Sequence, residues 1–311
     1  MTTSAPVAVS TDLEHLVRLA EQALGVPASA SLPPPADVRW HYPPNPRGPD
    51  GGARSMHVPL TLDGHPGAGF AHQPSIVDAV LRSLGPTVRV VVELGCGEGY
   101  NVSHLADAHP HVTFVGLDLL PAHLSSGGAT AENAWFAAAD FHRLPLAPSS
   151  VDLAFSVESL AHAVDLPAAL AATRAVLREG GRLVAIELLR TDRYARLPAL
   201  ARRAGELVEA LIAVPAQPTV SGFLGVARRA GLVVRHSRDL TGAALPMLTR
   251  LARRAARNLD DPAPDRRTVL TPALTWQALR AGSHALYALE LVATTSAAQL
   301  RNESELRPPI L

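Results

Sequence analysis

One stretch, Val88–Asn101, constrains the fold of this chain more than any other; it reads VRVVVELGCGEGYN. Its valines at 90–92 are β-branched and apolar, which favours a buried strand that is too short to be a helix. Gly95, Gly97 and Gly99 then recur at alternate positions, and a helical pattern follows them. A strand, a glycine turn and a helix bring backbone N–H groups and a helix N-terminus against a ligand. Glycine is needed because a Cβ would block either the positive φ of the turn or the approach of the ligand.

A second strand pattern, His111–Asp118 (HVTFVGLD), ends in a carboxylate 23 residues beyond Gly95. The spacing of the glycines does not match the G-x-G-x-x-G of dinucleotide sites, because position 100 is tyrosine. An acidic residue at this distance lies at the tip of the neighbouring parallel strand, where it can accept hydrogen bonds from both hydroxyls of a ribose. We predict this role for Asp118. The alternatives are a cap for the turn at 119–124 and, for the glycines, a tight turn of some other α/β domain.

Three further strand patterns follow, at 134–139, 151–157 and 178–189, with helical patterns between them. The series predicts an α/β fold with a doubly wound parallel sheet. In an open sheet of this kind, ligands bind beyond the C-terminal ends of the strands. Ser156, Glu158 and His162 would then face the ligand.

The pattern E-x-G-x-G-x-G at 93–99 resembles the first motif of class I S-adenosylmethionine (AdoMet) methyltransferases. SVESLAHAVD at 156–165 is similar to the E-S-x-x-H segment of members that methylate quinones, tocopherols, sterols and natural-product sugars, and REGG at 178–181 resembles their glycine junction. The resemblance covers 74–240 and, less clearly, 285–295. It implies a Rossmann-like seven-stranded sheet whose last strand, antiparallel, is 285–295, although that segment could equally be helical.

The resemblance implies AdoMet as the cofactor and a methyltransferase that acts on C, O or N of a small organic acceptor, in specialised metabolism. The alternatives are a non-methylating AdoMet-binding protein, an enzyme that uses AdoMet for another reaction, and an acceptor that is an isoprenoid or isoprenyl diphosphate carbon. The cofactor-binding residues that it implies come from the strand ends and the helix before the first strand: Gln73, Glu93, Gly95, Cys96, Gly97, Asn101, Asp118, Leu119, Asp140, Phe141 and Ser156. Asp140 would accept from the adenine amino group, and Phe141 would pack on the ring.

Two residues are candidates for catalysis, Glu158 and His162. Histidine titrates near neutral pH, so His162 could act as a general base for a hydroxyl acceptor. Glu158 could stabilise a developing cation or take the final proton. The alternative for Glu158 is a buried structural carboxylate that holds loop backbone or the AdoMet amino group, and for His162 a capping or packing histidine.

Composition bounds the partners. The formal net charge is zero, which argues against nucleic acid. Cys96 is the only cysteine, so the chain has no internal disulfide and no cysteine metal cluster, and the irregular spacing of the N-terminal histidines predicts no metal. The sequence shows neither a signal-peptide pattern nor an apolar run of membrane-spanning length. We expect a cytoplasmic protein that has no membrane partner and that could form a homodimer.

Four parts are predicted along the chain. Residues 1–57 hold an amphipathic helix at 11–24 and a Pro/Gly-rich segment that is either a linker or a strap over the site. Residues 58–190 form the AdoMet-binding core, and 191–218 a lid helix. Residues 219–311 complete the core around a second helical insertion at 241–284. Within these parts we expect helices at 74–84, 194–213, 219–230, 245–258 and 272–281, and a sixth strand at 232–240.

Overall fold

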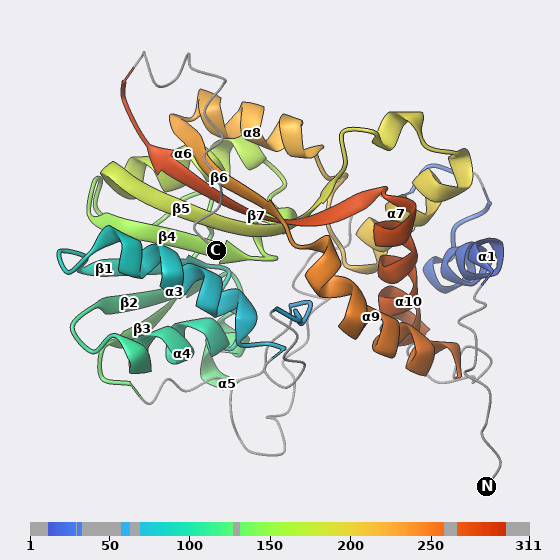
Figure 1. The fold of residues 1–311 in the computed structure, drawn as a ribbon, viewed down its shortest axis with the longest axis horizontal. Coiled ribbons are helices and arrows are strands. Elements are labelled where there is room, and N and C mark those ends of the chain that lie inside the picture. Colours follow the sequence, from blue (N-terminus) through green and yellow to red (C-terminus); the bar gives the residue numbers. More distant parts are fainter. Residues whose placement is uncertain are drawn as a thin grey trace, which may run out of the picture.

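The computed structural model describes residues 12–28, 30–32, 57–62, 69–126, 131–257 and 266–296. Its centre is a seven-stranded sheet in the order β3-β2-β1-β4-β5-β7-β6 (Figure 1). Neighbouring strands are parallel except β7, which runs antiparallel to both β5 and β6. The strands are β1 (Val90–Leu94), β2 (Thr113–Asp118), β3 (Ala134–Ala138), β4 (Val151–Val157), β5 (Leu177–Arg190), β6 (Leu232–Asp239) and β7 (His284–Ala293).

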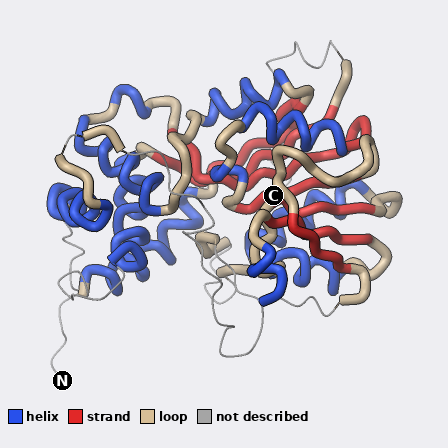
Figure 2. The backbone as a smooth tube through the Cα atoms, turned by 180° about the vertical axis from the view of Figure 1, so that it is seen from behind, coloured by secondary structure: helices blue, strands red, loops and turns tan. Residues whose placement is uncertain are grey.

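Helices cover both faces of the sheet (Figures 1 and 2). On one face lie α3 (His72–Leu84), α4 (Tyr100–Ala108) and α5 (Pro121–Ser126), and on the other α6 (Leu166–Val176) and α8 (Val220–Arg229). β4 is buried along its whole length, because its successive side chains point to opposite faces of the sheet and helices cover both faces. Phe155 belongs to the core that includes α3, whereas Ala154 belongs to the core that includes α6 and α8. The predicted α/β class and seven-stranded doubly wound sheet are therefore confirmed.

A cluster of four helices stands beside the sheet (Figures 1 and 2). It contains α1 (Leu13–Leu24), α7 (Ala199–Leu211), α9 (Thr241–Ala256) and α10 (Arg266–Ala281), and α10 packs against the other three. β5 and β6 lead into α7 and α9, and β7 leaves α10, so the cluster lies at the edge where the parallel strands end. Arg203 and Glu21 join α7 to α1, with Nε and Oε1 2.9 Å apart. The expected lid helix, the second insertion and the N-terminal helix thus form one body.

Several boundaries differ from the sequence predictions. Segment 285–295 is a strand as expected, β7, and Asp12 caps α1 with its side chain. The helices predicted at 245–258 and 272–281 begin earlier, at Thr241 and Arg266, so that Pro246 and Pro272 lie inside α9 and α10. The predicted bounds would put both prolines in a first turn, where proline costs no hydrogen bond. In the interior of a helix each proline removes one hydrogen bond, and both helices pack against neighbours, α9 on α10 and α10 on α7.

The helix predicted at 194–213 is shorter than expected. It divides into a 3-10 turn, η3 (Tyr194–Arg196), and α7, because Pro198 is the N-cap of α7 and favours extended backbone before a helix. A second 3-10 turn, η2 (Leu160–His162), follows β4. The Pro/Gly-rich segment predicted at 27–57, as a linker or a strap, lies mostly outside the described residues, which omit 33–56.

Candidate functional site

The glycine turn, residues 95–99, joins β1 to α4. Gly95, Gly97 and Gly99 have φ values of +72°, +53° and +83°, the left-handed region that the spacing predicted. The N–H groups of Gly95 and Cys96 donate to the carbonyl of Leu117 at 2.7 and 2.9 Å, which attaches the turn to the end of β2. The Cys96 thiol is buried beneath the turn, and burial raises its pKa well above the ordinary value.

Asp118 ends β2 beside the glycine turn. Its Oδ2 accepts from the Gly97 N–H at 2.8 Å and its Oδ1 from the Leu120 N–H at 2.9 Å, and His123 Nδ1 lies 3.5 Å from Oδ1. The two backbone hydrogen bonds fix the carboxylate and leave each oxygen a second lone pair, which is what a ribose diol requires. The next side chain, Leu119, is 44% exposed although it is large and apolar. The predicted capping role and the predicted ribose role of Asp118 are compatible.

Buried acceptors flank the glycine turn. Asn101 Nδ2 donates to Glu93 Oε1 at 2.7 Å, and both side chains are buried. Burial and the charge of Asp118 outweigh the hydrogen bond from Asn101 and hold the pKa of Glu93 at about 8. Glu93 Oε2, Asn101 Oδ1 and Gln73 Oε1 have no hydrogen-bond partner among the described residues. Buried polar atoms without partners are costly, and a ligand with a positively charged amino group would satisfy them, because its charge favours the ionised, accepting form of Glu93.

The loop after β4, residues 158–165, carries both catalytic candidates. Glu158 has a φ of +53°, and the Oε1 of its half-buried side chain accepts from the Val58 N–H at 2.8 Å and from Gln73 Nε2 at 2.9 Å. Burial raises its pKa against these two hydrogen bonds. Gln73 Nε2 also donates to the Val58 carbonyl at 2.6 Å. Glu158 therefore fastens Val58 and Gln73 to this loop, which is the contact pattern of a carboxylate that holds backbone.

His57 precedes Val58 and gives the segment 57–60 a further contact with the protein. Its Nε2 lies 3.1 Å from the Phe70 carbonyl, and burial lowers its pKa to about 4, so the ring is neutral.

His162 lies in η2 with Nδ1 3.3 Å from the Ala213 carbonyl. A carbonyl can only accept, so this contact places the proton of His162 on Nδ1 and makes Nε2 the acceptor nitrogen.

Asp140 and Phe141 follow β3, at the same edge of the sheet as Asp118. The Asp140 side chain is 49% exposed, accepts from the His142 N–H at 2.9 Å, and lies 2.6 Å from His142 Nδ1. Burial raises the pKa of Asp140, but the hydrogen bonds and charge of His142 outweigh it, so the pKa is lowered and the group is ionised. Phe141 packs beside the His142 ring, 5.0 Å between centroids.

Ser156, predicted to face the cofactor, has a fully buried hydroxyl 2.5 Å from Glu187 Oε1. Three residues near the site were not predicted: Val58, Ser159 and Glu187. Ser159 was inside the quoted motif, and Glu187 was a charged residue within an apolar strand pattern, a signal that could have singled it out.

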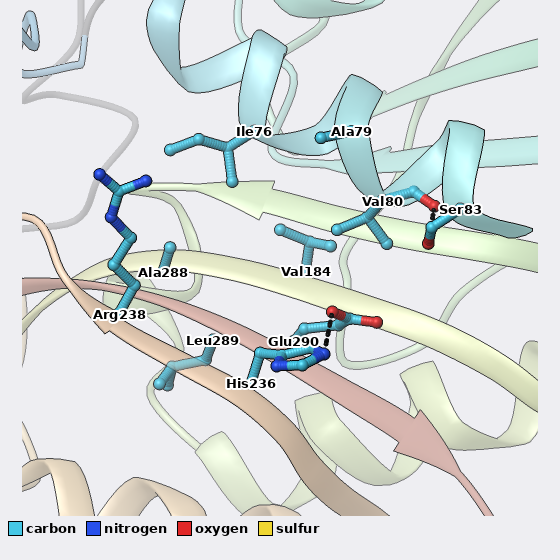
Figure 3. A pocket seen from close by; sticks show the side chains of 10 residues that line it. All are labelled: Ile76, Ala79, Val80, Ser83, Val184, His236, Arg238, Ala288, Leu289 and Glu290. Carbon is cyan, nitrogen blue, oxygen red and sulfur yellow. Dashed lines mark hydrogen bonds and ion pairs between the residues drawn. The ribbon is translucent and has the colours of Figure 1, made fainter. Parts of the chain in front are cut away.

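Another buried charge cluster lies away from the strand ends. Under α3 a cavity of about 40 Å³, roughly the space of one water molecule, opens on the sheet (Figure 3). Its lining residues are Ile76, Ala79, Val80, Ser83, Val184, His236, Arg238, Ala288, Leu289 and Glu290. Glu290 pairs with Arg182, and it lies 3.6 Å from Arg235 Nε and 3.8 Å from His236 Nε2. The cluster sits on the face of β5, β7 and β6, so it is separate from the site at the strand ends.

Two other kinds of feature are absent from the described ranges, a cluster of metal ligands and a membrane-spanning helix. No three His, Cys, Asp or Glu side chains there gather in a way that could hold a metal ion. No described helix is long and apolar enough to cross a membrane.

Comparison with known proteins relates the site to a family. Residues 92–185 match a family described as methyltransferase domain. An S-adenosyl-L-methionine-dependent Diels-Alderase from Talaromyces variabilis is 32% identical over 51% of this chain and 58% of its own length, and an O-methyltransferase from Penicillium expansum is 29% identical over 58% and 69%. This chain therefore spans less than two thirds of the Diels-Alderase.

Among solved structures, a protein described as a putative sarcosine dimethylglycine methyltransferase from Galdieria sulphuraria has a TM-score of 0.65. It is 15% identical, and the match covers 78% of this chain and 94% of that protein. The motifs, the strand order and the matched domain agree. The chain has the fold of class I AdoMet-dependent methyltransferases, and its residues 92–185 match the methyltransferase domain family.

Proposed function

We propose that this chain is an AdoMet-dependent methyltransferase that acts on a hydroxyl group of a small organic acceptor in specialised metabolism. The observation that carries the proposal is the set of buried acceptors on Glu93 and Asn101 around a left-handed glycine turn, with the Asp118 carboxylate fixed at the next strand end. That set suits a ligand with an amino group and a ribose. When bound, AdoMet would supply an electrophilic methyl group on its sulfonium.

The residues divide the work of binding. Asp118 would accept from the ribose hydroxyls with its remaining lone pairs, and the exposed Leu119 would pack on the adenine. The ionised Asp140 would accept from the adenine amino group, and Phe141 would pack on the ring from beyond β3. At the other end of the cofactor, Glu93 Oε2 and Asn101 Oδ1 would receive the amino group. Together these contacts align the methyl group for displacement, which is the main requirement of the reaction.

A hydroxyl acceptor must also lose its proton. His162 suits this step because its contact with the Ala213 carbonyl makes Nε2 the nitrogen that can take a proton. Glu158 is a weaker candidate for chemistry, since its Oε1 is committed to Val58 and Gln73. Its role in this proposal is to hold residues 57–60 beside the site. The Penicillium relative is named as an O-methyltransferase, which supports oxygen as the methylated atom.

Two measurements test the proposal. Calorimetry should show one AdoMet bound per chain, and incubation of a metabolite extract with methyl-labelled AdoMet should yield a labelled product with S-adenosylhomocysteine, detected by mass spectrometry. AdoMet binding without label transfer would favour a non-methylating use, as the name of the Diels-Alderase relative suggests. Failure to bind AdoMet would overturn the proposal.

A further inference from the structure

A buried chain of oxygen atoms runs beneath the loop after β4. Glu187 Oε1 on β5 lies 2.5 Å from Ser156 Oγ on β4, and Ser156 Oγ lies 2.8 Å from Ser159 Oγ. Ser159 Oγ donates to the carbonyl of Leu94 at the end of β1. Glu187 and Ser156 have no exposed surface, and Ser159 is 9% exposed. Four residues from three strands and one loop are thus linked by three contacts.

The hydrogens of this chain can be counted. The Leu94 carbonyl can only accept, so the single hydroxyl hydrogen of Ser159 is used there. The contact between Ser159 and Ser156 then needs the hydroxyl hydrogen of Ser156. The last contact, between Ser156 and Glu187, needs a hydrogen from the carboxyl group. An ionised Glu187 would take the Ser156 hydrogen and leave two lone pairs facing each other 2.8 Å apart.

The hydrogen-bond chain also holds the backbone around the site. The Leu160 N–H donates to Ser156 Oγ at 3.0 Å and to Glu187 Oε1 at 3.1 Å, and the Ala161 N–H donates to Glu187 Oε2 at 3.2 Å. These two residues begin η2, which contains His162. On the other side, Ser159 packs on the glycine turn so closely that a Cβ added to Gly95 would lie 2.4 Å from its Cβ.

We propose that Glu187 is a positioning residue: as a neutral carboxylic acid it heads an ordered hydrogen-bond chain through Ser156 and Ser159 to Leu94, and so fixes the loop after β4 against the glycine turn. The effect on cofactor binding rests on the proposed function, but the protonation state and the order of the chain do not.

The surroundings of Glu187 favour its neutral form. Burial is the largest influence and raises its pKa, and the charge of Glu158 acts in the same direction. The hydrogen bonds that the ionised form would accept from Ser156, Leu160 and Ala161 oppose them, and the resulting pKa is about 7. Asp165 lines the same cavity of about 410 Å³, which adjoins Glu187, and carries the same sign of charge. The described residues that line this cavity from α8 and from 215–218 are all uncharged.

The test compares wild type with Glu187→Gln by chemical denaturation between about pH 5 and about pH 8.5. An amide can donate its N–H to Ser156 and accept from the Ala161 N–H, so E187Q keeps the direction of the hydrogen-bond chain at every pH. It loses only the 3.1 Å contact from the Leu160 N–H, which still donates to Ser156 Oγ. The folded pKa of about 7 lies above the ordinary value of 4.5, so folded wild type binds a proton that the unfolded chain has lost. Relative to E187Q, the wild-type midpoint should fall as pH rises to about 7, then stay constant.

The control is Glu132→Gln, which changes an exposed glutamate. Its midpoint should run parallel to wild type at every pH. Parallel curves for wild type and E187Q would show that Glu187 is ionised and would overturn the proposal. Should E187Q fail to fold, ¹³C NMR of labelled glutamate carboxyls decides instead. A resonance that titrates near neutral pH and shifts in Ser156→Ala supports the proposal, and a Ser156→Ala spectrum with no shift among such resonances contradicts it.

Calorimetry tests whether the hydrogen-bond chain affects AdoMet binding. Ser159→Ala keeps the Cβ against Gly95 but breaks the chain, so AdoMet should bind about tenfold more weakly, the loss of roughly one hydrogen bond. E187Q should bind within about threefold of wild type at low pH. Unchanged affinity in Ser159→Ala would refute the link to the glycine turn. If wild type itself does not bind AdoMet, the proposed function fails, whereas the denaturation result still judges Glu187.

Discussion

Replacing Gly95 by alanine tests whether this glycine is required by the protein's own packing. The sequence gives two reasons for a glycine here, the positive φ and the approach of a ligand. The structure adds a third, because the new Cβ would lie 2.4 Å from the Cβ and 2.7 Å from the Oγ of Ser159. Atoms cannot remain at that separation, so the loop after β4 would have to move away from the glycine turn.

Two costs add in this substitution. A non-glycine residue in the left-handed region costs roughly 1–2 kcal/mol. Forcing an extra methyl group into a packed site typically costs about 1–3 kcal/mol more. We therefore expect Gly95→Ala to lower the free energy of unfolding by about 2–5 kcal/mol, out of roughly 5–15 kcal/mol for a typical protein.

Gly25→Ala is a matched control, because Gly25 has a φ of +67° and nothing lies within 4 Å of its added Cβ. It should lose only the conformational part. Guanidinium denaturation of both variants, of Ser159→Gly, and of Gly95→Ala combined with Ser159→Gly, measures the difference. Ser159→Gly loses the hydrogen bonds of Ser159 but also removes the clashing Cβ, so in this background Gly95→Ala should cost only the conformational part. Our reasoning would be refuted if Gly95→Ala were no more destabilising than Gly25→Ala, or if Gly95→Ala cost as much in the Ser159→Gly background as in wild type.

Four further outcomes are expected. Asp118→Ala should weaken AdoMet binding about 10–100-fold in calorimetry, whereas Asp107→Ala, on the exposed side of α4, should not; equal affinities would remove the ribose assignment. His162→Ala should cut turnover of a hydroxyl acceptor by about 10²–10⁴ and leave AdoMet affinity near wild type; full turnover would exclude it as the base. Glu158→Ala should speed hydrogen exchange of the Val58 amide, while Glu158→Gln, which keeps an acceptor, should not. Because burial raises the pKa of Glu93 to about 8, wild type should lose stability relative to Glu93→Gln as pH rises from about 5 to 8, and denaturation curves that run parallel would contradict this.

The parts of the molecule that depend on local sequence could be predicted. The valine run, the alternate glycines and the carboxylate of Asp118 follow one another closely in the chain, so they indicated β1, the turn and β2 with their correct roles in the fold. The helix starts at 241 and 266 could not be predicted, because proline favours a first turn locally and only packing between α9 and α10 overrides it.

The interior partners of the site depend on register and on distant segments. Glu187 meets Ser156 because β4 and β5 pair with Ser156 opposite Ala185, a register that no local pattern specifies. Glu158 turns toward Val58, which is 100 residues earlier in the chain. For this reason Glu158 and Ser156 could be predicted as site residues from the sequence, but their hydrogen bonds to other residues of the protein could not.

The composition of the helical cluster has a consequence for the order of folding. α1 begins at residue 13, yet it packs on α7 and α10, and its ion pair from Glu21 to Arg203 spans 182 residues. Closing so long a loop costs more entropy than forming the consecutive strands and helices of the sheet. We expect β1 to β4 to assemble while the chain is being synthesised, and α1 to keep an apolar face exposed until α10 has left the ribosome. Of the described helices, the first in the sequence would then be among the last to dock.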